Sequence, residues 1–317
     1  MSAPPPVEAR GLVKRYGDLV AVDAVDLTVE AGDVFGYLGP NGAGKTTSLR
    51  MLLGLIRPTD GSVRLFGRDP LLEGAKALDG VAGFVEGPRF YPYLSARRNL
   101  RLLADYDGGK ANGRIEEVLD LVELRDRAKD RVGGYSHGMR QRLGIAASLL
   151  RAPRLLLLDE PATGLDPAGM RVMRALVKRL AGEGITVLLS SHLLSEVEEL
   201  CNRVAIIRSG RIVYQGSLAE LMATAHGGYR LRTSEPERAR AICLAQAGVR
   251  DVGLVDGTLR FAADEDAVAT LTIALGVAGI GITALFPDVA SLEELFLDLT
   301  EGDEHERPKV ALAEVAA

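Results

Sequence analysis

The sequence predicts an α/β protein in which helices cover a sheet of buried parallel strands. Residues 155–158 are four consecutive leucines followed by turn residues, a pattern typical of a central parallel strand. Apolar runs at residues 34–38, 185–189 and 204–207 have a similar form, and helical patterns separate them. Strands that alternate with helices place a ligand site at the carboxyl ends of the strands. The residues that carry chemistry are therefore expected at that edge of the sheet.

Composition restricts the class of protein further. The 317 residues allow more than one domain, and the net charge of −5 argues against a protein that coats nucleic acid. Two cysteines, Cys201 and Cys243, are too few for a disulfide framework and fit a reduced, cytosolic setting. The sequence has no run of about 18 apolar residues and no secretory signal in residues 1–6. A role at a membrane would then require docking through a partner.

The strongest motif is the segment Gly-Pro-Asn-Gly-Ala-Gly-Lys-Thr at residues 39–46, which fits G-x-x-x-x-G-K-[ST] at every position. It follows an expected strand and opens an expected helix, the context that favours a phosphate-binding P-loop. Glycines let backbone N–H groups converge on phosphate oxygens, and the helix N-terminus adds positive potential. Lys45 can reach the β- and γ-phosphates, and Thr46 can bind Mg²⁺. The predicted nucleotide-binding residues here are Gly39, Asn41, Gly42, Ala43, Gly44, Lys45, Thr46 and Thr47.

An acidic pair ends the leucine strand. In a P-loop fold this position places Asp159 beside the metal and lets Glu160 face the γ-phosphate, where it can activate water as a general base. The alternative is a solvated acidic pair after a strand, which the P-loop upstream disfavours.

A third motif, Tyr-Ser-His-Gly-Met-Arg-Gln at residues 135–141, precedes an expected helix. Ser136 and Gly138 can offer a hydroxyl and a backbone N–H to a phosphate, although a serine that only caps the helix would look the same. The segment resembles the signature of ABC cassettes, and its position just before the Asp159 strand also matches that family.

Three more residues match the family pattern. Tyr16 resembles the aromatic residue that stacks on adenine, with a core tyrosine at a strand end as the alternative. Asp166, in Gly-Leu-Asp, resembles the loop that links two cassettes, and it can also be a helix N-cap. His192 resembles the switch histidine that senses the γ-phosphate, whereas a lone histidine is more often structural.

The resemblance implies an ABC cassette with a mixed sheet core, an antiparallel β subdomain and an α-helical subdomain. It implies ATP and Mg²⁺ as cofactors and a homodimer or heterodimer of cassettes. Two ATP molecules would lie at the dimer interface, with in-trans contacts from Ser136, His137, Gly138, Met139 and Asp166. It also implies a membrane permease on a separate chain, whose cytoplasmic helices would contact residues 87–100, and a peripheral location at the cytoplasmic face of the membrane. No nucleic-acid partner is expected.

The chain is expected to hold two folded units. The cassette would span residues 7–225, with a helical subdomain at about 87–150 whose core candidates include Leu100, Leu103, Val118 and Leu119. A small α+β accessory domain is expected at residues 227–300, because its patterns follow a β-α-β-β-α-β order as in ferredoxin-like domains. Residues 1–6 and 301–317 are expected to be disordered tails.

Two departures from the general pattern suggest a subfamily. Glu86 stands where a glutamine usually meets Mg²⁺ and the membrane subunit, so the expected metal residues are Thr46, Glu86 and Asp159; a solvated loop glutamate is the alternative. His137 and Met139 replace the usual Gly and Gln of the signature. Together with the closing Ser-Leu-Glu-Glu-Leu-Phe at residues 291–296, these features are similar to exporters of the bacitracin-, lantibiotic- and daunorubicin-resistance type.

Other functions remain as alternatives at this point. An importer ATPase would use the C-terminal unit as a regulatory domain, and Glu86 and the ending at Phe296 weigh against it. A soluble ABC protein without a transporter usually carries two cassettes or a long insertion, neither of which is present. A degenerate cassette that cannot hydrolyse ATP is disfavoured because Lys45, Asp159, Glu160 and His192 are all in place. ATPase-driven export is therefore the favoured function.

Overall fold

A computed structural model describes residues 3–106, 108–224, 228–288 and 292–301. The chain divides into two compact units, Met1–Leu218 and Ala219–Ala317. The sequence placed this boundary about eight residues later, near residue 226, because a helix at its end was counted with the first unit. Residues 1–2 and 302–317 of the two expected tails lie outside the described residues. Residues 3–6 are described, and Pro6 O accepts a hydrogen bond from Phe66 N at 3.2 Å.

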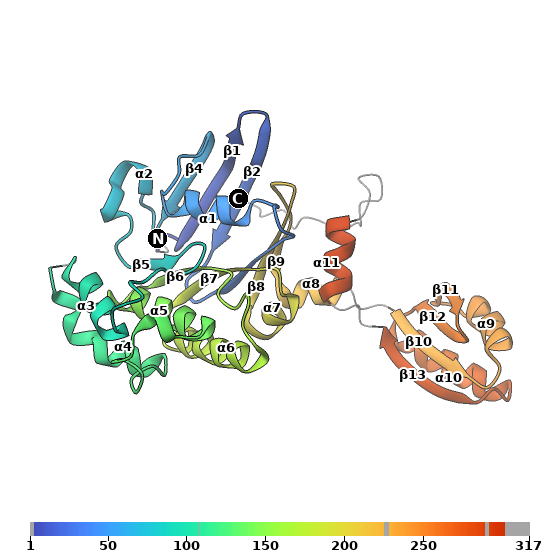
Figure 1. The fold of residues 1–317 in the computed structure, drawn as a ribbon. Helices are drawn as coiled ribbons and strands as arrows, with labels where there is room; N and C mark the ends of the chain where they lie inside the picture. Colours follow the sequence, from blue (N-terminus) through green and yellow to red (C-terminus); the bar gives the residue numbers. More distant parts are fainter. Residues whose placement is uncertain (1–2, 107, 225–227, 289–291, 302–317) are drawn as a thin grey trace. The chain divides into compact units, whose positions relative to one another are not determined.

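Unit 1 is built on a six-stranded mixed sheet with the order β5-β6-β7-β3-β8-β9 (Figure 1). The first five strands in that order are parallel, and β9 runs antiparallel to β8. The strands are β3 (Val34–Leu38), β5 (Val81–Phe84), β6 (Leu155–Asp159), β7 (Thr186–Ser191), β8 (Arg203–Arg208) and β9 (Arg211–Ser217). Both faces of a parallel sheet are covered, which explains why all five residues of β6 are buried.

The strand order sets the position of the site. In the sheet, β7 lies between β6 and β3 and is parallel to both, so the carboxyl ends of these three strands meet at one edge. The loop after β3 leads into α1 (Lys45–Leu52), β6 ends at Asp159 and β7 ends at Ser191. Three segments that are far apart in the sequence are thereby brought together.

A three-stranded antiparallel sheet with the order β2-β1-β4 packs beside this core. Its strands are β1 (Val7–Tyr16), β2 (Leu19–Val29) and β4 (Asp60–Leu65). Alternate side chains of β1 and β2 point inward and share one apolar core with β3 and α1, in which Leu27, Phe35 and Leu49 are fully buried or nearly so. The short helices α2 (Pro70–Glu73) and η1 (Gly74–Lys76) follow β4.

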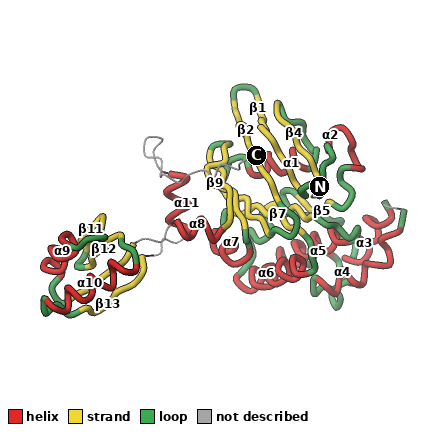
Figure 2. Tube along the Cα trace, turned by 180° about the vertical axis from the view of Figure 1, so that it is seen from behind, coloured by secondary structure: helices red, strands yellow, loops and turns green. Residues whose placement is uncertain are grey.

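The helical part of unit 1 lies between β5 and β6 in the sequence. It contains α3 (Ala96–Asp105), η2 (Lys110–Arg114), α4 (Ile115–Leu121), η3 (Val132–Gly134) and α5 (His137–Leu149). Leu100, Val118 and Leu119 are buried as expected, but the core prediction for Leu103 is wrong, because 43% of its surface is exposed. The turn of α3 points Leu103 away from the side that packs on α4 and α5. Figure 2 shows these helices together with α6 (Pro167–Gly182) and α7 (Leu194–Leu200).

Unit 2 has a four-stranded antiparallel sheet with the order β11-β12-β10-β13. Two helices cross between strands and pack on it, and their buried side chains include Cys243, Leu271 and Leu275. The elements are α8 (Leu218–Thr224), β10 (Gly228–Thr233), α9 (Pro236–Ala245), β11 (Arg250–Val255), β12 (Thr258–Ala262), α10 (Glu265–Val277), β13 (Ile282–Asp288) and α11 (Leu292–Glu301). From β10 to β13 the order is β-α-β-β-α-β.

We expect Gly83→Ala to destabilise unit 1. Gly83 pairs with Leu157 across β5 and β6, and its φ of +152° aims the Cβ position at a point 1.9 Å from Leu157 O. The backbone oxygen cannot move without separating the two strands, so a loss of about 2–3 kcal/mol in the free energy of unfolding is expected by denaturant titration. Gly182→Ala is the control, since no atom lies within 4 Å of its Cβ position. A Gly83→Ala protein as stable as the control would contradict this strand pairing.

Candidate active site

The phosphate-binding loop between β3 and α1 has glycines where a side chain would not fit. Gly44 is the N-cap of α1 with φ +107°, and a Cβ there would lie 2.4 Å from Ala21 O. A Cβ on Gly39 would lie 2.4 Å from Ile207 O. The loop that precedes the first N–H groups of α1 therefore packs directly on the neighbouring backbone. This arrangement can place backbone donors around an anion.

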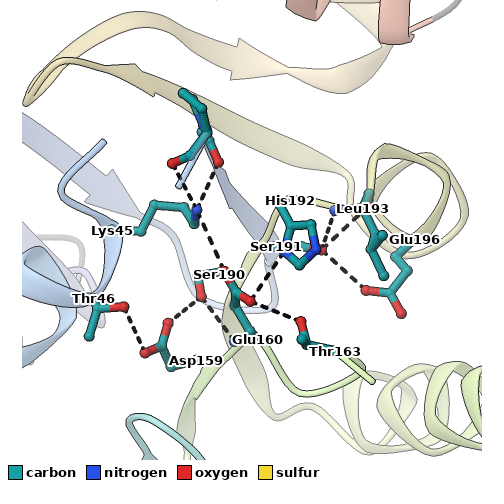
Figure 3. A network of polar contacts seen from close by, with 12 residues as sticks. Lys45, Thr46, Asp159, Glu160, Thr163, Ser190, Ser191, His192, Leu193 and Glu196 are labelled. Atoms are coloured by element: carbon teal, nitrogen blue, oxygen red, sulfur yellow. Dashed lines mark hydrogen bonds and ion pairs between the residues drawn. The ribbon is translucent and has the colours of Figure 1, made fainter. Parts of the chain in front are cut away.

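Lys45 is held inside this loop rather than extended into solvent. Its Nζ donates to Gly39 O at 2.7 Å and to Pro40 O at 3.2 Å, and the residue is only 5% exposed (Figure 3). The same Nζ lies 3.6 Å from Glu160 Oε1. The ammonium group is thus fixed between the P-loop and the acidic end of β6, at the place where a bound phosphate would need a cation.

Asp159 has a carboxylate oriented by three neighbours. Thr46 Oγ1 donates to Oδ2 at 3.0 Å, Ser190 Oγ donates to Oδ1 at 2.5 Å, and Glu86 N donates to Oδ2 at 3.3 Å. Asp159 is 4% exposed. A carboxylate next to a threonine hydroxyl is an oxygen set of the kind that Mg²⁺ prefers. The residues present therefore fit a magnesium ion.

Glu160 lies one residue further, on a left-handed turn with φ +48°. Its Oε2 accepts from Thr163 Oγ1 at 2.9 Å and lies 3.2 Å from His192 Nδ1. Burial alone would raise the pKa of Glu160, but the hydrogen bond from Thr163 and the charges of His192 and Lys45 outweigh it and lower the pKa. An ionised carboxylate in this position can accept a proton from water.

His192 is positioned by the two serines before it. Ser190 Oγ accepts from Glu160 N at 3.0 Å, and Ser191 Oγ accepts from Leu193 N at 2.9 Å and lies 3.2 Å from Glu196 Oε2 (Figure 3). Glu196 is 3% exposed; burial raises its pKa, and the hydrogen bond with Ser191 lowers it by less. The loop that carries the histidine is therefore tied to the end of β7 on one side and to α7 on the other.

Sequence reasoning missed several of these contributors. Ser190, Ser191 and Thr163 each lie within three residues of a predicted site residue, so proximity to the motifs was the available signal. Glu196 follows His192 by four residues and gave a weaker signal. Arg50 lies three residues after Thr47, but its partner Glu86 is 36 residues away along the chain, so proximity to the P-loop gave no signal of this pair.

Glu86 contacts the site through its backbone, while its carboxylate has another partner. Its N–H reaches Asp159, its φ is +64°, and its carboxylate forms an ion pair with Arg50 on α1. The Glu86 side chain is 57% exposed. The alternative that Glu86 is a solvated loop residue agrees with its exposure, but it does not account for its contacts with Asp159 and Arg50. Arg50 offsets the negative charge that a carboxylate brings next to Asp159.

We expect Arg50→Met to raise the KM for ATP by about fivefold in the presence of Mg²⁺, because the unpaired Glu86 carboxylate then repels nucleotide phosphates. The double variant Arg50→Met, Glu86→Gln should return KM to near that of Glu86→Gln alone. Arg179→Met is the control, since it breaks a comparable exposed pair with Glu183 on α6. Additive effects of the two substitutions on KM would show that this pair does not tune nucleotide binding.

Tyr16 ends β1 with 47% of its surface exposed, so the alternative of a core tyrosine is wrong. Lys14 Nζ lies 5.0 Å from the centroid of its ring. An exposed ring at this position remains free to stack on a planar group.

The signature residues and Asp166 act as helix caps. Ser136 Oγ accepts from Met139 N at 3.2 Å at the start of α5, and Asp166 Oδ1 accepts from Gly169 N at 2.7 Å at the start of α6. His137 Nε2 lies 3.0 Å from Thr163 O, which links the signature to the turn after Glu160. A residue that caps a helix can also contact a second cassette, so the capping bonds of Ser136 and Asp166 do not conflict with that predicted contact. Gly138 and Met139 lie in the first turn of α5.

The fold and the grouped residues define a P-loop ATPase of the ABC-cassette class. The family described as ABC transporter matches residues 22–163. A bacitracin transport ATP-binding protein of Bacillus licheniformis is 38% identical over 298 residues, which cover 93% of this chain and 97% of the relative. A daunorubicin resistance ATP-binding protein of Streptomyces coeruleorubidus is 37% identical, with 92% and 95% coverage.

Solved structures agree with these matches. An ATP-binding subunit of an ABC transporter has 27% identity and a TM-score of 0.61, covering 69% of this chain and 92% of its own. A dimeric bacterial ABC transporter cassette has 25% identity and a TM-score of 0.61, with 67% and 98% coverage. The chain belongs to the ABC transporter family and is an ATP-binding subunit that hydrolyses ATP to power transport. Within the described residues, no helix has the length and apolar character to cross a bilayer.

Proposed function

We propose that this chain powers export of an antibiotic, an antimicrobial peptide or a hydrophobic drug through a membrane subunit encoded separately. The observation that carries the proposal is the extent of the match to the bacitracin transport protein, which covers 93% of this chain and therefore includes unit 2 as well as the cassette. The daunorubicin resistance protein matches over a similar range. The chain would lie at the cytoplasmic face of the membrane, bound to the membrane subunit.

In the proposed reaction, the P-loop N–H groups and Lys45 bind the phosphates of ATP. Thr46 and Asp159 would hold Mg²⁺, which would supply charge neutralisation on the phosphate oxygens when bound, and Glu86 would act on the ion through its N–H to Asp159 while its carboxylate stays paired with Arg50. Glu160 accepts the proton of the attacking water, and Thr163 and His192 hold its carboxylate in position. Tyr16 stacks on adenine. The support for these roles is the convergence of Lys45, Asp159, Glu160 and His192 at the ends of three adjacent strands.

The proposed working form contains two cassettes. This chain has one P-loop. In the described residues the hydrogen bonds and ion pair of Lys45 go to Gly39, Pro40 and Glu160. A second copy or a paralogue would bring its nucleotide to Ser136, His137, Gly138, Met139 and Asp166. The dimeric cassette among the similar solved structures supports this arrangement. Closure on two ATP molecules would then drive the membrane subunit, and hydrolysis would release it.

The experiment that tests this function measures Mg²⁺-dependent ATPase activity of the purified chain with and without the membrane protein that co-purifies with it. The panel contains peptide antibiotics and hydrophobic drugs, with sugars and amino acids as import-type controls. We expect at least about threefold stimulation by one compound class in the assembled complex only. Activity that no partner or compound changes would leave the ATPase in place and contradict the export proposal.

A further inference from the structure

One pocket of unit 1 is lined mainly by cations and takes no part in the ATP site. It has a volume of about 490 Å³, and five of its seven lining residues are basic: Arg97, Arg98, Arg101, Lys129 and Arg131. Tyr93 and Ser95 complete it. No acidic residue lines this pocket.

The pocket is a built feature of the fold. Three of its cations lie on α3, and the other two lie on the segment that precedes η3. Backbone hydrogen bonds join these segments, from Arg97 N to Ala128 O at 3.1 Å and from Val132 N to Leu94 O at 3.0 Å. Ser95 and Arg131 also form an isolated antiparallel bridge. The cationic side chains are therefore held around one cavity by the backbone.

Most of this positive charge has no partner in the described part of the chain. Arg97 pairs with Glu116, whose pKa the guanidinium lowers by a hydrogen bond. The nearby Asp130 pairs with Arg127 instead. Among the described residues, no carboxylate pairs with Arg98, Arg101, Lys129 or Arg131. Four like charges around one cavity favour an anion with several oxygens, which can accept from more than one of them.

The surface beside the pocket has the composition of a membrane interface. Leu102 and Tyr106 follow Arg98 by four and eight residues, so they lie on the same face of α3, and they are 40% and 88% exposed. Tyr93 is 65% exposed. Cations next to exposed tyrosine and leucine are typical of surfaces that contact lipid headgroups. Figure 1 shows α3 at the outer edge of unit 1.

We propose that this basic pocket binds the phosphate of anionic lipid headgroups, with Leu102 and Tyr106 entering the interfacial layer. The chain as a whole has a net charge of −5 and would be repelled by an anionic membrane. A local basic cluster is therefore needed for attraction, and it would orient the helical part of unit 1 toward the membrane surface. The inference rests on the proposed function for the presence of a membrane, and at residues 93–98 it replaces the expected contact with helices of the membrane subunit by contact with lipid.

The test measures co-sedimentation of the full chain with vesicles of phosphatidylglycerol and phosphatidylcholine, compared with vesicles of phosphatidylcholine alone. We expect binding to the anionic vesicles only, and its loss at high salt. Arg98→Gln with Arg101→Gln should weaken binding roughly 30-fold. Arg171→Gln with Lys178→Gln is the control, because it removes the same charge from exposed positions on α6 and should change binding less than about twofold.

Three other outcomes would overturn the proposal or assign the pocket to a different ligand. Equal losses in both double variants would show a diffuse charge effect and overturn the proposal. Full displacement from vesicles by millimolar inorganic phosphate would assign the pocket to a soluble phosphate instead of a lipid. Binding of a glutamate-rich peptide without binding of vesicles would make it a protein-docking site. ATPase activity of the unbound variants is measured in parallel, so that a failed lipid site is distinguished from a failed ATPase or transport assignment.

Discussion

We expect Glu160→Gln to abolish nearly all ATP hydrolysis while ATP still binds. The amide keeps the size of the side chain and can still accept the hydrogen bond from Thr163, but it cannot take a proton from water. Loss of a general base costs about 10²–10⁴ in rate, so kcat should fall by that factor. Because the pKa of Glu160 is lowered, the wild-type carboxylate is ionised at neutral pH and ready to act.

The measurements for this variant are steady-state phosphate release and equilibrium binding of ATP. The matched control is Glu183→Gln, which replaces an exposed glutamate at the end of α6 that pairs with Arg179. The ATP-bound Glu160→Gln protein is also expected to accumulate as a dimer in size-exclusion chromatography, since closure is retained and reopening is not. Hydrolysis at the parental rate would show that Glu160 is not the base.

Lys45→Ala is expected to weaken ATP binding by about 10- to 150-fold. The substitution removes the buried ammonium group that lies between the P-loop carbonyls and Glu160, and a charge-assisted hydrogen bond contributes about 1.5–3 kcal/mol. Titration with a fluorescent ATP analogue measures the loss directly. The fold should persist, because the hydrogen bonds of Lys45 Nζ go to carbonyls of its own loop and its other partner is Glu160 at 3.6 Å.

Lys178→Ala on α6 is the control for this second prediction, since it removes an exposed lysine of the same unit. Circular dichroism on both variants separates a lost contact from a lost fold. ATP affinity of Lys45→Ala within about threefold of the parent would mean that the phosphates lie elsewhere and would remove the P-loop from the binding site.

The class of fold and the main site residues could be predicted because their signals are local. The P-loop motif is contiguous, and its glycines at 39 and 44 meet backbone oxygens that leave no room for a side chain. The run of four leucines predicts strand β6 and shows where its acidic end lies. The burial of Leu103 was predicted wrongly because helical periodicity shows an apolar position without showing which neighbouring elements cover it.

The partners of the site residues depended on long-range pairing. The ion pair of Glu86 with Arg50 joins the loop after β5 to α1, and no short pattern contains both. The hydrogen bond from Ser190 to Asp159 forms because β6 and β7 are neighbours in register, which the strand lengths do not reveal. The basic pocket likewise combines α3 with a segment about 30 residues later.

The sequence by itself therefore determined that this protein is a P-loop ATPase, because a contiguous motif can carry its own local geometry. The tertiary structure decided how Lys45, Asp159, Glu160 and His192 meet, which neighbours hold each charge, and where four cations remain without a carboxylate partner among the described residues. The physical reason is that sheet order and helix packing are properties of distant segments in contact, and charge compensation is settled only after those contacts form.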